Sequence, residues 1–88
     1  MTEQEIKSLF PLKAMITQEI IDNARLYNTK RCIGALTLKS VVPDDSVDWG
    51  DLSGYIESDE YSRVWITTRG RVSMMDVIKP QEVTFILE

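Results

Sequence analysis

The sequence predicts one small α+β domain, with helices in its N-terminal half and strands mainly in its C-terminal half. Apolar residues recur at three- and four-residue steps between positions 12 and 27, which is the spacing of one helix face. β-Branched and aromatic residues gather at 62–67 and alternate with other residues at 82–88, as they do in strands. The chain has 88 residues, of which 43% are hydrophobic and 27% charged, so both its composition and its length are typical of a folded domain with one core.

The first residues predict two helices. Thr2 is placed to cap a short helix, and Glu5 follows three positions later, which is the spacing of a capping box. Pro11 suits the first turn of the next helix because its fixed φ angle is already helical. That helix would run for about four turns. Its apolar stripe would consist of Leu12, Met15, Ile16, Ile20, Ala24 and Tyr27.

The middle of the chain predicts two shorter helices around a turn. Thr37 is placed to cap a helix within residues 34–42, although the leucines of this segment also fit the alternation of a strand. Pro43 and the following "DDS" predict a turn. A third helix would then span residues 47–52 and end at Gly54, since glycine is common just beyond a helix C-terminus.

The last third of the chain predicts a hairpin, a helix and a strand. The segments "YIES" (55–58) and "SRVWIT" (62–67) are short strands joined by "DEY". Thr67 would cap a helix that runs to about Lys79, with apolar residues at helical spacing on one side. The segment "EVTFILE" (82–88) alternates like a strand.

Three motifs in this order resemble the winged-helix branch of helix-turn-helix proteins. They are "GALTLKSVV" (34–42), "VDWGDLSGYIE" (47–57) and "ITTRGR" (66–71), and the resemblance covers about residues 12–79. It implies a winged-helix-like domain with three N-terminal helices, a short wing hairpin and a C-terminal helix, to which this chain adds a terminal strand beyond Lys79 that departs from the family pattern. Gly50 inside the third helix departs from the pattern, because glycine costs about 1 kcal/mol there relative to alanine.

A second arrangement fits the same residues. A loop of Thr68, Arg69 and Gly70, with Gly70 left-handed, would form a hairpin, and the N-terminal helix would pack on an antiparallel sheet. In that arrangement the core side would receive Val64, Ile66, Val72 and Met74. The two predictions differ in whether residues 71–78 form a helix or a strand.

The charge pattern predicts an acidic binding surface. Between Asp44 and Glu60 the chain has seven acids and no Lys or Arg, whereas the other residues hold ten bases and seven acids. Such a surface would attract a basic protein, for example a nucleic-acid-binding enzyme or a transcription component. The predicted partner-binding residues are Asp44, Asp45, Asp48, Trp49, Asp51, Tyr55, Glu57, Asp59 and Glu60. The two aromatic residues in this set could be interface anchors, but core positions are the favoured interpretation for them.

The function predicted from these features is that of a non-enzymatic regulatory protein that binds another protein. One alternative is a DNA-binding regulator, in which a homodimer forms through "EVTFILE". Its nucleic-acid contacts would be Lys39, Arg63, Trp65, Arg69 and Arg71. The acids on the expected reading helix disfavour this alternative, because affinity for DNA comes mainly from Lys and Arg contacts to phosphates. A further alternative is an inhibitor whose acids mimic nucleic acid.

Composition argues against several other classes. The chain has no histidine and a single cysteine, Cys32, so neither an internal disulfide nor a mixed Cys/His zinc site is expected. No nucleophile motif, phosphate-binding loop or calcium-loop spacing is present, and we therefore expect neither catalysis nor a cofactor. The sequence lacks an apolar run long enough to cross a bilayer and a secretory signal, which predicts a cytoplasmic protein.

Overall fold

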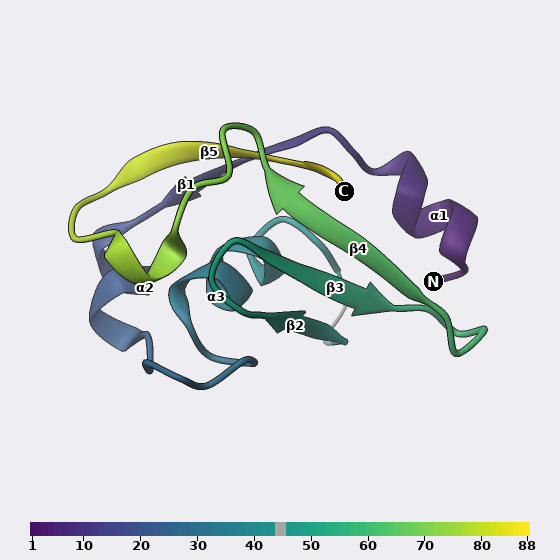
Figure 1. The fold of residues 1–88 in the computed structure, drawn as a ribbon, viewed down its shortest axis with the longest axis horizontal. Coiled ribbons are helices and arrows are strands. Elements are labelled where there is room, and N and C mark those ends of the chain that lie inside the picture. The colour runs from purple at the N-terminus through teal and green to yellow at the C-terminus, as the bar shows by residue number, and fades with distance from the viewer. Residues whose placement is uncertain (44–45) are drawn as a thin grey trace.

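A five-stranded antiparallel sheet curls around one helix in the computed structural model of this chain, which describes residues 1–43 and 46–88 (Figure 1). The strands are β1 (Leu12–Ile16), β2 (Val47–Trp49), β3 (Ser53–Glu57), β4 (Arg63–Thr68) and β5 (Gln81–Leu87). The helices are α1 (Glu3–Ser8), α2 (Gln18–Asn23) and α3 (Ile33–Lys39), with a 3-10 turn, η1 (Met74–Asp76). The strand order is β1-β5-β4-β3-β2, and α3 contacts both edge strands, β1 and β2, so the sheet wraps around this helix.

The predicted capping box at the start of the chain is confirmed. The Glu5 backbone N–H donates to the Thr2 hydroxyl at 3.1 Å, and the Thr2 N–H donates to the Glu5 carboxylate at 2.9 Å. These two bonds satisfy donors that would otherwise be unpaired at the helix N-terminus. Ile6 of α1 is fully buried in the hydrophobic core, and the helix packs against β4.

The predicted helix from Pro11 to Tyr27 is wrong. The segment instead forms β1 and, directly after Thr17, the six-residue helix α2, whose N-terminus is capped where the Ile20 N–H donates to the Thr17 hydroxyl at 3.1 Å. In β1, Ala14 and Ile16 are buried while their neighbours are exposed, which is the period of a strand. Pairing with β5, nearly seventy residues away, overrides the helical spacing of the apolar residues.

Residues 33–39 do form a helix, but Thr37 does not cap it. The helix begins after Cys32, and the buried Thr37 hydroxyl bonds back to the Ile33 carbonyl at 2.7 Å. The helix therefore starts four residues earlier than its predicted cap.

The predicted third helix is wrong, and with it the winged-helix arrangement. Val47 and Trp49 point into the core from β2 and Asp48 points outward, while β3 runs antiparallel to this strand. Trp49 is 1% exposed, so it belongs to the core. Its indole occupies space left by two glycines, because a Cβ at Gly34 of α3 or at Gly54 of β3 would collide with the indole.

The predicted helix from Thr67 to Lys79 is also wrong. β4 continues to Thr68, Gly70 adopts a left-handed φ of 83°, and the chain then makes only the single turn η1 before β5. The second predicted arrangement is correct about the antiparallel sheet and about the left-handed φ of Gly70, but its hairpin is wrong, because Thr68 still belongs to β4 and residues 71–78 form no strand. The hairpin of β3 and β4 and the terminal strand are confirmed, with β5 one residue earlier than expected.

One cluster of buried residues joins the sheet to the helices. Its largest fully buried members are Trp49, Phe85, Ile6, Ile16, Leu38, Ile56, Ile66 and Met74. Trp49 and Phe85 meet edge to face, with ring centroids 5.4 Å apart. None of the helices in the described ranges has the length and apolar character needed to cross a bilayer.

Candidate functional site

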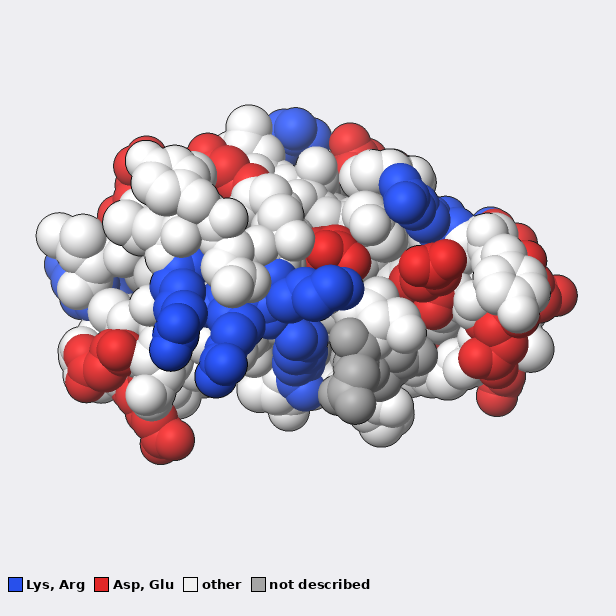
Figure 2. All heavy atoms as spheres, turned by 90° about the horizontal axis from the view of Figure 1, so that it is seen from below, with Lys and Arg blue, Asp and Glu red and all other residues white. Residues whose placement is uncertain are grey.

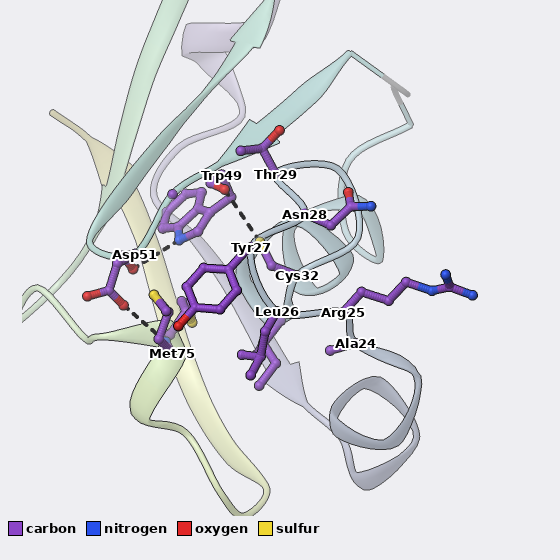
Figure 3. Close-up of a pocket in the computed structure, with 13 residues that line it drawn as sticks. Ala24, Arg25, Leu26, Tyr27, Asn28, Thr29, Cys32, Trp49, Asp51 and Met75 are labelled. Carbon is purple, nitrogen blue, oxygen red and sulfur yellow. Dashed lines mark hydrogen bonds between the residues drawn. The ribbon is translucent and has the colours of Figure 1, made fainter.

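A pocket of about 270 Å³ opens between three segments that are far apart in the sequence (Figure 3). One wall is the loop from α2 to α3, the second is the turn after β2, and the third is η1. The lining residues are Ala24, Arg25, Leu26, Tyr27, Asn28, Thr29, Cys32, Ile33, Trp49, Gly50, Asp51, Met74 and Met75. Buried Ile33, Trp49 and Met74 lie at its inner side, and its rim carries exposed apolar side chains.

The rim is formed by three large side chains that lack cover. Leu26 is 64% exposed, Tyr27 is 88% exposed, and Met75 is 42% exposed. Figure 3 shows Leu26 and Tyr27 extending from the α2–α3 loop, while Met75 lies across from them on η1. Exposed apolar side chains gathered around an apolar pocket are typical of a surface that another molecule covers.

Backbone hydrogen bonds hold the α2–α3 loop in place. The Arg25 N–H donates to the Arg31 carbonyl at 2.9 Å, and the Cys32 N–H donates to the Asn28 carbonyl at 2.8 Å, so the loop closes on itself. The Trp49 N–H donates to the Thr29 carbonyl at 2.8 Å, which joins the loop to β2. The loop thus presents its exposed side chains from a backbone that is already ordered.

Tyr27 has an unusual backbone conformation. Its φ angle of 63° lies in the left-handed region, which costs a residue other than glycine about 1–2 kcal/mol. The exposed ring returns little of this cost through burial within the protein. The surrounding hydrogen bonds of the loop, rather than packing of the tyrosine itself, maintain the conformation.

Asp51 fixes the opposite wall of the pocket. Its carboxylate accepts from the Ser73 hydroxyl at 2.6 Å and from the Met75 N–H at 3.0 Å, and its carbonyl accepts from the Trp49 indole N–H at 3.2 Å. The Ser73 bond, followed by the Met75 bond, holds the pKa of Asp51 below its ordinary value, while burial acts weakly in the opposite direction. Asp51 therefore ties η1 to the turn after β2 and positions the two methionines.

The chemistry of the pocket is apolar. The Cys32 thiol donates to the Trp49 carbonyl at 3.4 Å, and the Asp51 carboxylate is occupied by two donors from the protein. Within residues 1–43 and 46–88, no three side chains of the metal-ligating types lie together. The pocket can exclude water from an apolar group, and it offers few free polar atoms to orient a polar one.

The predicted acidic residues that the structure describes do not all lie on one face, although Asp48 and Glu57 share the outer face of β2 and β3 with Tyr55. Asp44 and Asp45 lie outside the described residues. Asp48 points outward from β2 and pairs with the Lys30 ammonium at 3.0 Å. Asp51 lies at the turn before β3, whereas the remaining predicted acids, Glu57, Asp59 and Glu60, lie at or beyond the other end of that strand.

The acids after β3 join the N-terminus. The Asp59 carboxylate pairs with the terminal ammonium at 3.0 Å, and the Glu60 carboxylate accepts from the Glu3 N–H at 2.9 Å. Of the two predicted aromatic anchors, Trp49 is buried, and half-buried Tyr55 lies on the outer face of the sheet.

The residues proposed for contact with nucleic acid are also spread out. Arg63 and Trp65 share the outer face of β4 with Tyr55 of β3, where the Trp65 and Tyr55 ring centroids are 5.0 Å apart and the Arg63 guanidinium lies 4.3 Å from the centre of the Tyr55 ring. Arg69 and Arg71 follow the end of β4, and Lys39 ends α3. The structure brings Arg63 and Trp65 together around Tyr55, whereas Arg69 and Arg71 lie in the turn after the same strand and Lys39 lies on a different element.

Residues 24–27 and 74–75 were expected within helices, so the pocket was not predicted from the sequence. One available signal was the run "RLYNTK" (25–30), in which Asn28 and Thr29 are common turn residues next to two large apolar side chains.

No protein-family model, curated protein or solved structure matches the chain, so its function is inferred from this geometry.

Proposed function

We propose that this chain is a non-enzymatic protein-binding domain whose pocket receives an apolar side chain of a partner protein. The observation that supports the proposal is the apolar pocket of about 270 Å³ bordered by exposed Leu26, Tyr27 and Met75. The predicted role in protein interaction is kept, but its location moves from the acidic segment to this pocket.

The size of the pocket favours a single side chain over a cofactor. Sites for drug-sized ligands and cofactors usually enclose roughly 300–1,000 Å³, so this pocket lies just below that range. Protein interfaces commonly depend on a few large apolar or aromatic side chains that fill pockets of the partner. A ring of exposed apolar residues around the mouth would add contact area that a small enclosed ligand would not use.

The expected energies are those of an interface anchor. Complete burial of a leucine or phenylalanine side chain contributes about 1.5–3 kcal/mol. Burial of the exposed rim residues by the partner adds to this contribution. Because hydrogen bonds already order the α2–α3 loop, binding costs less conformational entropy.

The polar groups of the pocket favour binding over catalysis. The Cys32 thiol and the Asp51 carboxylate already make hydrogen bonds that hold the walls together. A nucleophile normally requires a neighbouring base, and the chain has no histidine to serve as one for Cys32. The dispersed acids of residues 46–60 are a weaker basis for partner capture, because several of them are used in internal bonds.

The proposal is tested by selecting peptides from a random displayed library on the whole protein and mapping the selected peptides by amide NMR shifts. We expect the peptides to share one large apolar residue and to shift amides of residues 24–29 and 74–75. Tyr27→Ala should weaken their binding about tenfold or more, as loss of an interface anchor does. Peptides without a shared apolar residue, or binding that maps elsewhere, would contradict the proposal.

Tyr61→Ala is a matched control for Tyr27→Ala. Tyr61 is 90% exposed with a φ of 61°, compared with 88% and 63° for Tyr27, so both replacements have the same effect on exposure and backbone strain. Tyr61 lies in the β3–β4 turn, away from the pocket. Equal loss of binding in the two variants would show that the pocket is not the site.

A further inference from the structure

A basic patch lies beside the pocket. It consists of Arg25, Lys30, Arg31 and Lys39, from the α2–α3 loop and α3, and Figure 2 shows Lys and Arg side chains gathered on this face of the molecule. The Arg25 N–H bonds to the Arg31 carbonyl at 2.9 Å, and the Lys39 ammonium bonds to the Lys30 carbonyl at 2.7 Å, so these residues are neighbours in space. Arg25 is also part of the pocket lining.

The two arginines of the basic patch have no acidic partner among the residues that the structure describes. Lys30 is offset by Asp48 at 3.0 Å, but neither Arg25 nor Arg31 has a described carboxylate within 4.0 Å. Both side chains are exposed, and Figure 3 shows the Arg25 side chain extending from the rim away from the indole of Trp49. Arg25 at the rim, with Arg31 hydrogen-bonded beside it through the backbone, is thus placed to contact groups that lie next to an inserted side chain on the side of the α2–α3 loop.

The chemistry of this arrangement fits carboxylates. Guanidinium groups form paired, charge-assisted hydrogen bonds with carboxylates and with phosphates. Phosphates of a nucleic acid are the less favourable match, because a base in this apolar pocket would leave its polar edge atoms unpaired. The protein as a whole carries a net charge of −4, so attraction of an acidic partner must be local to the basic patch.

We infer that the partner segment is acidic: its apolar side chain fills the pocket, and neighbouring Asp or Glu residues on the side of the α2–α3 loop pair with Arg25 and Arg31. The inference rests on the proposed function, since it specifies the sequence around the anchor that the pocket receives. It reverses the charge expected from the sequence, which predicted a basic partner for the acidic segment.

Four short fluorescent peptides test the inference by anisotropy with the whole protein. Three have a central leucine flanked by glutamates, glutamines or lysines, and the fourth has a central alanine flanked by glutamates. We expect the acidic leucine peptide to bind about two- to thirtyfold more tightly than the neutral leucine peptide, the range for two exposed ion pairs. The basic leucine peptide should bind more weakly than the neutral one, and added salt should reduce the advantage of the acidic peptide.

Charge-removing variants separate the basic patch from the pocket. The single variant R31Q, at a residue outside the pocket lining, should reduce the advantage of the acidic peptide and leave affinity for the neutral leucine peptide unchanged. The double variant R25Q/R31Q should remove the advantage of the acidic peptide. The double variant R69Q/R71Q removes two exposed arginines at the end of β4 and should keep the advantage.

The possible outcomes are distinguishable. Equal binding of the acidic and neutral leucine peptides would overturn the inference while the proposed function stands. Equal binding of the acidic leucine and alanine peptides, or no binding of any peptide, would overturn both. A thymidine oligonucleotide that binds more tightly than the acidic leucine peptide, and loses binding in R25Q/R31Q, would overturn the inference in favour of nucleic acid.

Discussion

Gly34→Ala is expected to destabilise the protein, although alanine is normally the better residue inside a helix. A Cβ at position 34 would overlap the indole of Trp49. The indole has no space to move away, because Gly54 packs closely against it and the ring of Phe85 contacts it edge to face, with the two ring centroids 5.4 Å apart. Overpacking of this kind costs about 1–3 kcal/mol, whereas the gain in helix propensity is about 1 kcal/mol. Because the Cβ would lie too close to three atoms of the indole, the cost falls in the upper part of this range, at about 2–3 kcal/mol, and the net loss is about 1–2 kcal/mol.

Urea and thermal unfolding followed by circular dichroism measure this loss. A decrease of 1 kcal/mol lowers the melting temperature of a domain of this size by about 4–8 °C. Gly50→Ala is the control, because a Cβ there meets only the Ser53 carbonyl at an ordinary 3.5 Å. That variant should be neutral or slightly more stable, since it restricts the unfolded chain. A Gly34→Ala protein as stable as the wild type would refute the reasoning about the indole.

Three further predictions concern the pocket and its supports. Tyr27→Gly and Tyr61→Gly should each leave stability unchanged or raise it by up to about 1 kcal/mol, because glycine removes the left-handed strain, and urea titrations of the pair should agree. Asp51→Asn should cost about 1 kcal/mol at neutral pH through weaker bonds to η1. Because the folded-state pKa of Asp51 is lowered, its contribution is present above the ordinary carboxyl pKa and lost as pH falls through the folded value, so the variant and wild type should converge in stability in acid. Thr17→Ala should cost about 0.5–2 kcal/mol in thermal unfolding by removing the N-cap of α2, and an unchanged melting temperature would contradict that role.

Local signals in the sequence were sufficient where the structure depends on neighbouring residues. The capping box of Thr2 and Glu5, the hairpin of β3 and β4, and the terminal strand were all predicted correctly. Each depends on residues close in sequence, or on an alternation that only a strand explains.

Local signals failed where distant pairing decides the structure. The apolar residues of 12–16 fit both a helix face and a strand, and the choice is made by β5, whose partners for Ala14 and Ile16 are Val83 and Gln81. The segment 47–57 contains motifs similar to a third helix, but Gly54 is needed for close approach of Trp49 and not for ending a helix. A glycine has several structural uses, and the sequence does not distinguish them.

The candidate site could not be located from the sequence for the same reason. Its walls come from residues 24–29, 49–51 and 74–75, and only the folded sheet brings them together. The acids between 44 and 60 are close together in the sequence, but successive residues of a strand point to opposite faces of the sheet, so closeness in sequence does not place them on one surface. Asp48 turns outward to Lys30, while Asp51 turns toward η1, so acids three positions apart serve different parts of the fold.

Trp49 connects the stability of the domain to the shape of the pocket. Its ring fills the space left by Gly34 and Gly54 in the core, and it also lies at the inner side of the pocket. Its backbone N–H donates to the Thr29 carbonyl in the α2–α3 loop, and its indole N–H donates to the Asp51 carbonyl on the opposite wall. A substitution that displaces this residue must therefore alter both walls, whereas removal of an exposed rim side chain such as Tyr27 leaves them in place. We therefore expect substitutions of rim side chains to weaken binding without lowering stability, and substitutions that displace Trp49 to affect both. Measuring binding and stability together thus distinguishes a side chain that contacts the partner from one that acts through the core.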